Sequence, residues 1–146
     1  MSRVGNLKLE IINSQKKIPV VAIRIKKLVL KALSEVCLKR SAEITVCFVD
    51  DKRMKELNYK FHHRNSPTDV LAFDLSLRPG KEIIADIVVS AETAKSNAKE
   101  FGTTPGYELE LYVVHGVLHL LGYKDATVRQ REQMQVVAER IIASLK

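Results

Sequence analysis

A run of apolar residues that carries two histidines constrains the fold of this chain more than any other segment. Leucine and valine dominate the stretch from Leu109 to Leu121, so a helix here is apolar on nearly every side and must be buried. His115 and His119 lie four residues apart within it, a spacing that places both imidazoles on one face of a helix. Burying two imidazoles without polar partners is costly. The sequence therefore predicts a central helix whose histidines meet either a metal ion or neighbouring polar groups of the core.

The residues after this helix supply a third group of the kind that binds metal ions. Gly122 stands where the helix is expected to end, because glycine takes the left-handed conformation beyond a helix C-terminus at no steric cost. The chain can then fold back and bring Asp125 to the two histidines. Two imidazole nitrogens and one carboxylate leave a fourth position open for water, as in catalytic zinc sites. We therefore predict one zinc ion per chain, bound by His115, His119 and Asp125.

The same motif lacks the general base of a zinc protease. In the H-E-x-x-H zincins a glutamate follows the first histidine and accepts the proton during peptide hydrolysis, whereas this chain has Gly116 there. The spacing through Gly122 to residue 125 otherwise resembles that of the metzincin metalloproteases, with Asp125 in place of their third histidine. The sequence thus predicts a zincin-like metal helix, and metalloprotease activity is kept only as a minor alternative.

Length and composition fit one domain of ordinary globular character. The chain has 146 residues, of which 46% are hydrophobic, and this suits a single domain over residues 1–146. No apolar stretch is long enough to span a bilayer, and the first ten residues show no signal-peptide pattern. We therefore expect a cytoplasmic protein without membrane contact. Cys37 and Cys47 lack a C-x-x-C spacing and are interpreted as buried hydrophobic residues.

The charge balance favours a polyanionic partner, with nucleic acid first. Lysine and arginine number 24 against 17 acidic residues, which gives a net charge of +7. Tryptophan is absent and aromatic residues make up 5%, which argues against a stacking platform for bases and leaves phosphate contacts to supply most of the affinity. Much of the basic charge gathers in one run, either an RNA track or a solvated helix face: Lys52, Arg53, Lys55, Lys60, His62, His63 and Arg64.

Hydrophobic periodicity and turn residues divide the chain into nine elements. We expect strands at residues 7–13, 44–49, 70–75 and 83–89, with a turn at Arg78-Pro79-Gly80. Helices are expected at about 19–39, 50–60 and 90–101, in the histidine segment, and at about 127–145. The first strand reads as an edge strand, and the near-continuous apolar run at 83–89 reads as a central one. The order predicts an α/β (α+β) fold, one small mixed sheet with about five packed helices.

Two motifs resemble those of the YbeY family of metal-dependent endoribonucleases, which mature ribosomal RNA and take part in bacterial ribosome quality control. The segment from His115 to Tyr123 reads H-G-V-L-H-L-L-G-Y, and the family pattern is H-G-x-L-H-L-x-G-Y. The segment from Thr68 to Phe73 reads T-D-V-L-A-F, where the family has T-D-V-L-S-F. Asn58 and the pair Asp86-Ile87 match more weakly. The resemblance reaches from the second strand nearly to the C-terminus.

The resemblance implies a central four-stranded mixed sheet with a metal site at its edge. It implies a single-strand-specific endoribonuclease whose partners are ribosomal RNA and the small ribosomal subunit, with no small-molecule substrate. Two departures fall on functional positions of the family: Asp125 stands for its third histidine, and His62 stands for an arginine ahead of T-D-V-L. His62 and Arg64 are the expected catalytic phosphate contacts.

RNA binding is expected from the basic run, at Lys52, Arg53, Lys60 and Arg64. The second hypothesis comes from another class of protein. With both family positions altered, the chain could be a ribosome-associated RNA-binding factor with weak or no nuclease activity.

Overall fold

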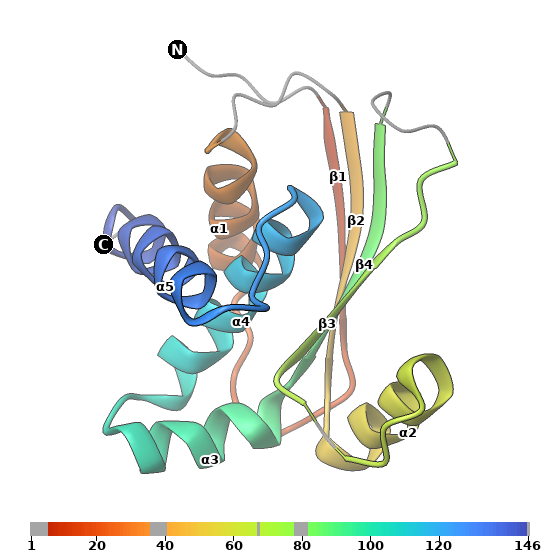
Figure 1. Cartoon of the computed structure of the whole chain (residues 1–146), viewed down its shortest axis with the longest axis vertical. Coiled ribbons are helices and arrows are strands. Elements are labelled where there is room, and N and C mark those ends of the chain that lie inside the picture. Colours follow the sequence, from red (N-terminus) through yellow and green to blue (C-terminus); the bar gives the residue numbers. More distant parts are fainter. Residues whose placement is uncertain (1–5, 36–40, 67, 78–81, 146) are drawn as a thin grey trace.

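The computed structural model of the chain describes residues 6–35, 41–66, 68–77 and 82–145. These residues form one four-stranded sheet and five helices (Figure 1), in the order that the sequence predicts. The strands are β1 (Leu7–Asn13), β2 (Ser41–Val49), β3 (Val70–Asp74) and β4 (Glu82–Ser90). The helices are α1 (Ala22–Ser34), α2 (Asp51–His62), α3 (Ala91–Phe101), α4 (Pro105–Leu120) and α5 (Val128–Ala143).

The sheet is mixed, with the strand order β1-β2-β4-β3. β1, β2 and β4 run parallel to one another, and β3 pairs antiparallel with β4. β4 is therefore paired on both sides, as its apolar run predicts, while β1 and β3 form the two edges. Because side chains alternate along a strand, each strand contributes to both faces of the sheet.

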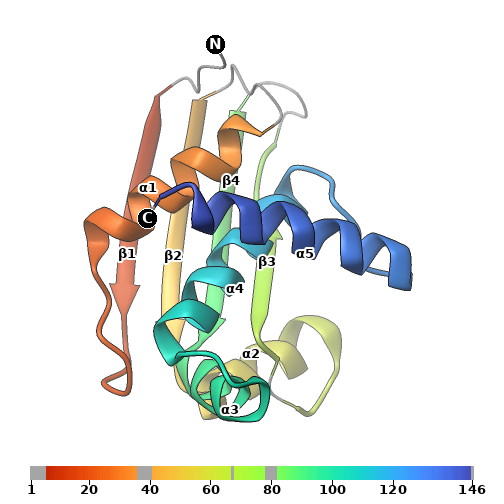
Figure 2. The ribbon, with the colours of Figure 1, turned by 90° about the vertical axis from the view of Figure 1, so that its left-hand side faces the viewer.

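The helices cover the two faces of the sheet unequally. α1, α4 and α5 lie on one face, and α2 lies on the other (Figures 1 and 2). The main core fills the space between the sheet and the helical layer, and β4 directs Ile83, Ala85, Ile87 and Val89 into it. A smaller core of Val49, Met54, Leu71 and Val88 joins α2 to the opposite face.

Gly116 allows α4 to approach the sheet closely. A β-carbon at this position would lie 2.6 Å from Cγ2 of Ile87 on β4 and 3.3 Å from Cγ2 of Val70 on β3. No carbon–carbon contact between side chains is tolerated at the shorter distance, so only glycine fits without movement. The glutamate that zinc proteases carry next to their first histidine would collide with the sheet here.

Side-chain caps explain where α2, α3 and α5 begin. The carboxylate of Asp50 accepts a hydrogen bond from the Arg53 amide at 2.8 Å, and α2 ends at His63 in the left-handed conformation with φ 56°. Ser90 and Thr127 cap α3 and α5 through their hydroxyl groups. The helices expected from residues 50 and 90 thus begin directly after the caps Asp50 and Ser90.

Several boundaries differ from the prediction. The first helix begins at Ala22 rather than at Pro19, because the Gln15 carboxamide accepts hydrogen bonds from the amides of Lys17 and Ile18 and holds that segment as a turn. The predicted end of this helix near Lys39 lies outside the described residues. The same holds for Cys37 and for the predicted turn at residues 78–80. Cys47 is half-buried rather than fully buried. None of the described helices is both long and apolar enough to cross a membrane.

Candidate functional site

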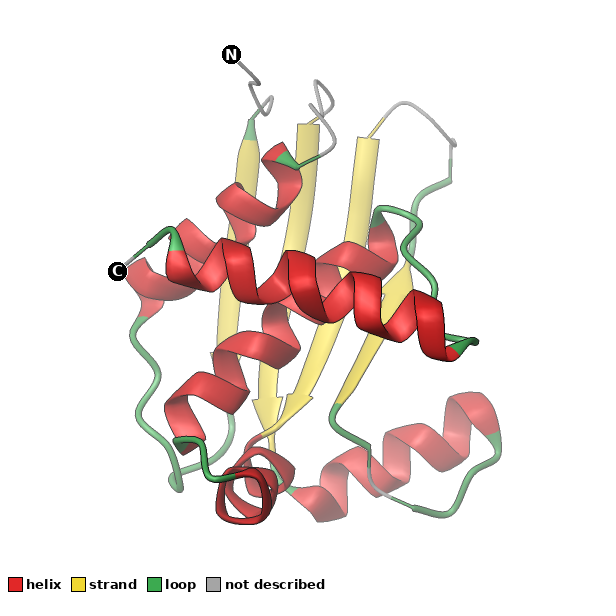
Figure 3. Cartoon of the chain, turned by 60° about the vertical axis from the view of Figure 1, so that its left-hand side comes forward, coloured by secondary structure: helices red, strands yellow, loops and turns green. Residues whose placement is uncertain are grey.

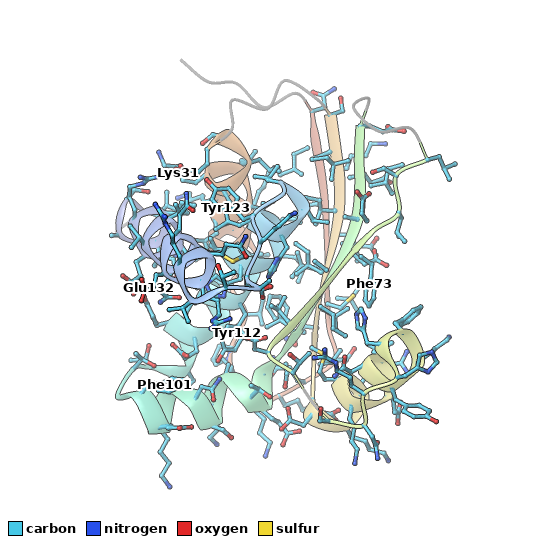
Figure 4. The ribbon with its side chains drawn as sticks, viewed as in Figure 1. Lys31, Phe73, Phe101, Tyr112, Tyr123 and Glu132 are labelled. Carbon is cyan, nitrogen blue, oxygen red and sulfur yellow. The ribbon has the colours of Figure 1, made fainter. Side chains whose placement is uncertain are left out.

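The three predicted metal ligands border one pocket of about 300 Å³ between the start of β3 and the helices α4 and α5. His115 and His119 come from the last two turns of α4, and Asp125 comes from the loop before α5. The rest of the wall consists of Thr68, Asp69, Val70, Arg131, Met134 and Gln135. Side chains from these helices and from β3 fill this part of the molecule in Figure 4, where Tyr112 and Tyr123 are labelled.

His115 presents an uncoordinated nitrogen to the interior. Its Nε2 atom is buried and has no hydrogen-bond partner among the described residues. Burial lowers the pKa of His115 below its ordinary value, and the negative charge of Asp69 opposes that shift. The imidazole is therefore held in the neutral form that ligates metal ions. A buried imidazole nitrogen without a hydrogen-bond partner is suited to coordinate a metal ion.

His119 is oriented by the turn that follows α4. Its Nδ1 atom lies 3.2 Å from the carbonyl oxygen of Tyr123. A carbonyl can only accept, so Nδ1 carries a hydrogen, and Nε2 is the ring nitrogen left to bind a proton or a metal ion. That Nε2 atom faces Oδ2 of Asp125 at 3.5 Å. A lone pair and a carboxylate repel each other unless a proton or a cation lies between them, and backbone support of the other ring nitrogen is characteristic of metal-binding histidines.

Glycine shapes this turn as the sequence predicts. Gly122 has φ 98°, and its amide donates to the His119 carbonyl at 3.0 Å. The Tyr123 amide donates to the Leu118 carbonyl at 3.0 Å, which completes a Schellman motif. The motif directs the chain back, and the guanidinium of Arg131 then donates to the Asp125 carbonyl at 3.1 Å. The backbone at Asp125 is thereby held next to the pocket.

These residues fit a metal ion in their donor chemistry. The set of two imidazoles and one carboxylate is suited to zinc, and His115 Nε2 has no hydrogen-bond partner among the residues that the structure describes. Their convergence is incomplete, since in the described parts of the chain no three His, Cys, Asp or Glu side chains are grouped closely enough to hold an ion. The carboxylate of Asp125 is 60% exposed and has room to move.

The predicted catalytic and RNA-binding residues lie away from this pocket. His62 ends α2 and Arg64 follows it, both exposed and neither bordering the histidines. The His62 ring stacks on Phe73, 6.2 Å between ring centres and 10° between planes, on the face of the sheet that α2 covers. Arg53 and Lys60 border a separate groove there. Lys52 is exposed on α2, so the basic run does not line the histidine pocket.

Sequence reasoning missed the contribution of α5. Arg131 and Gln135 are four residues apart and reach the pocket from one face of that helix. Their spacing was visible in the sequence, but nothing in it indicated which face meets the histidines. Asp69 accepts a hydrogen bond from the Val70 amide at 2.7 Å, and it also borders the pocket.

The fold and the pocket together define a small α/β protein with a histidine–carboxylate site between its central helix and an edge strand. The family model described as endoribonuclease YbeY matches residues 10–146, and the chain belongs to this family. A protein of Thermodesulfovibrio yellowstonii named endoribonuclease YbeY is 36% identical, over 96% of this chain and 98% of its own length. Another of that name, from Syntrophomonas wolfei, is 35% identical over 92% of this chain and 91% of its own.

A solved structure is similar as well. The solution structure of a Thermotoga maritima protein has a TM-score of 0.62 and 28% identity, over 92% of this chain and 88% of that one. Both comparisons cover nearly the whole chain, so the sheet and the five helices correspond to one family fold rather than to a shared fragment.

Proposed function

We propose that this protein is a zinc-dependent endoribonuclease that cleaves single-stranded segments of ribosomal RNA during its maturation and in ribosome quality control. Family membership supports hydrolysis of RNA, because the relatives are named endoribonucleases. The observation that carries the metal assignment is the buried, unpartnered Nε2 atom of His115 beside the apposed His119 and Asp125. The protein would act in the cytoplasm on RNA in the context of the small ribosomal subunit.

The residues of the pocket divide the work of hydrolysis. A bound zinc ion would polarise a phosphodiester oxygen and lower the pKa of a water molecule. His115, kept neutral by burial, and His119, oriented by the Tyr123 carbonyl, would hold the ion through their Nε2 atoms. Asp125 would supply the third ligand. Asp69 offers carboxylate oxygens in the same pocket that can accept a proton from water.

Cations near the pocket would hold the RNA backbone. The guanidinium of Arg131 borders the pocket and has donors beyond those that hold the Asp125 carbonyl, so it can contact the scissile phosphate. His62 and Arg64 lie at and just after the end of α2, outside the pocket, and would contact phosphates of flanking nucleotides. Several residues of this chain would thus share the phosphate contact that the family resemblance assigns to one arginine.

A ribosome-associated RNA-binding factor with weak or no nuclease activity is the second candidate. The incomplete convergence of the three ligands favours it, because an ion held by two histidines alone would bind weakly. The two candidates differ in metal content and in turnover, and both can be measured.

The test is metal content together with RNA cleavage. Purified wild-type protein loaded with zinc should carry about one ion per chain by mass spectrometry of the metal, as three-ligand sites do. His119→Ala should lose most of the metal and of the cleavage of a single-stranded RNA. His62→Ala removes a histidine on the other face of the sheet and should keep its metal. Equal metal content in the His119→Ala protein would refute the site, and zinc-loaded wild type without cleavage would favour the binding factor.

A further inference from the structure

A second hollow lies on the opposite side of the sheet from the histidine pocket. It is a groove of about 680 Å³ between α2 and the face of β1, β2, β3 and β4 that the helical layer leaves uncovered. In Figure 1, where the sheet is seen nearly edge-on, α2 is the helix on that side. Figure 3 looks onto the helix-covered face instead, with α2 drawn fainter at the lower right. Val88 and Cys47 form part of the floor, and Phe61 and Phe73 form part of the wall. We call this hollow the α2 groove.

Aromatic rings gather at the α2 groove although the chain has few of them. The rings of Phe61 and Phe73 lie 4.9 Å apart, and the His62 ring stacks on the outer side of Phe73. The Phe61 side chain is 50% exposed, so part of its ring is available to a further ring. Figure 4 shows Phe73 on the far side of the sheet from Tyr112 and Tyr123. The low aromatic content argues against a stacking platform, but the few rings that the chain has are gathered at this groove.

Positive charge borders the same rings. Lys60 places its ammonium 5.4 Å from the centre of the Phe61 ring, and Arg53 lies about two turns earlier on α2. The guanidinium of Arg53 pairs with an exposed carboxylate, that of Glu56, at 3.2 Å, and such a surface pair is easily exchanged for a phosphate. Both cations stand on α2, above the apolar floor.

Two carboxylates also border the groove, and they differ in what they already bind. Asp50 accepts the Arg53 amide as the cap of α2. Asp86 lies in the middle of β4, opposite Phe73 on β3, with its side chain on the groove face. It is therefore the acceptor in the floor that can receive an N–H group of a planar ligand.

We propose that the α2 groove binds an unpaired nucleobase of the RNA strand that is cleaved at the histidine pocket. The base would pack against Phe61 and Phe73 and donate to Asp86, while its phosphates meet Arg53 and Lys60. Stacking on aromatic rings beside a cationic track is the general mode of single-strand recognition. A protein side chain would match the apolar floor equally well, but not the combination of exposed rings with cations at the rim.

The edge strand β3 connects the two sites. Val70 at its start borders the histidine pocket, and Phe73 three residues later borders the α2 groove. Because β3 has a partner strand on one side only, an RNA strand that passes around its open edge can reach both faces. The groove would thus select single-stranded substrate, since a base in a duplex cannot enter it. This inference rests on the proposed function.

The experiment compares a ligand with bases and one without. Binding of labelled oligoadenylate and of inorganic polyphosphate is measured for metal-free protein by fluorescence anisotropy and by competition. Phe73→Leu should weaken oligoadenylate about tenfold and leave polyphosphate unchanged, since only the former stacks. Phe101→Leu removes an exposed phenylalanine on α3 and should change neither. Phe61→Leu, at a less buried ring, repeats the test should Phe73→Leu unfold.

Each outcome decides the proposal. Equal losses for both ligands would mean that the rings act only through folding or charge, and the proposal would be wrong. No loss for either ligand in both ring variants would also overturn it and would leave the groove to a protein partner. Failure of the proposed function would look different, because zinc-loaded wild type would then cleave no RNA whatever the ring variants bind.

Discussion

Gly116 affects both the packing of α4 and the chemistry that the histidine motif can support. Its missing side chain lets α4 rest on Ile87 and Val70, and the same absence removes the glutamate that would make the motif a protease. The sequence alone showed that the general base was missing. It could not show why, because the reason is a contact between two segments that are 29 residues apart in the numbering.

Replacing Gly116 by alanine should destabilise the protein. Overpacking in a tight core costs about 1 to 3 kcal/mol, while the better helix propensity of alanine returns up to about 1 kcal/mol, so the net effect is a loss. The free energy of unfolding from urea denaturation gives the measure. Gly106→Ala, in the first turn of the same helix with open space around it, should be neutral or stabilising. A stable Gly116→Ala protein would mean that α4 does not approach the sheet this closely.

Asp125 is the proposed ligand at which this chain departs from the family pattern. Its carboxylate faces His119 Nε2, and we expect Asp125→Ala to lose on the order of tenfold or more in zinc affinity. Asp125→His should retain zinc and be at least as active near neutral pH, because three neutral ligands leave the ion its full charge and make its water more acidic. Zinc titration and cleavage rates provide the measurements, with Glu132→Ala as the control for loss of an exposed carboxylate. An Asp125→Ala protein with unchanged zinc affinity would show that the carboxylate is not a ligand.

At the scale of the element, the turn after α4 ends the helix and also orients the His119 ring. Gly122 was predicted from the sequence because a left-handed residue after a helix is a local requirement. The hydrogen bond from His119 to the Tyr123 carbonyl was not predictable, since it depends on where the Schellman motif directs that carbonyl.

Gly122→Ala should therefore affect both stability and metal affinity. The φ of 98° is unfavourable for a residue with a β-carbon and costs about 1 to 2 kcal/mol. Relaxing it would also move the Tyr123 carbonyl and weaken zinc binding. Gly102→Ala is the matched control, because Gly102 ends α3 with φ 70° and should lower stability without changing zinc affinity. Equal zinc affinity in the two variants would mean that the turn at Gly122 does not orient the proposed zinc site.

The nine elements themselves were predictable because each depends on local patterns. The apolar run of β4 indicates a strand with neighbours on both sides. The caps Asp50 and Ser90 each bond to an amide three residues later, so they depend on local sequence alone. The start of α1 was wrong by three residues, since the Gln15 turn is made by a single buried carboxamide that no periodicity reveals.

At the scale of the whole molecule, the sheet separates two groups of candidate functional residues that the sequence places close together. His62 and Thr68 are six residues apart in the numbering, yet the first stacks on Phe73 and the second borders the histidine pocket. Which face a segment meets depends on the strand order and on the position of α2, and neither is written in local patterns. The sequence thus shows the basic run but not the face of the sheet on which it lies.

The position of the basic run leads to a prediction about salt. Each phosphate neutralised on a single strand changes the slope of log K against log salt concentration by about 0.7, so losing two contacts should flatten it by about 1.4. We expect this for the double variant Arg53→Ala with Arg64→Ala, measured with a single-stranded RNA by anisotropy. The loss of affinity should be similar for different RNA sequences, because phosphate contacts do not distinguish bases.

The matched control is the double variant Lys27→Ala with Lys31→Ala. It removes the same charge from exposed positions on α1, in the helical layer rather than beside α2. If the positive charge acts as a track at α2, only the first variant flattens the slope. If it acts as a net charge of +7 spread over the molecule, the two variants weaken binding alike. Equal slopes would therefore contradict a track at α2 and would leave RNA binding to the histidine pocket and its own cation, Arg131.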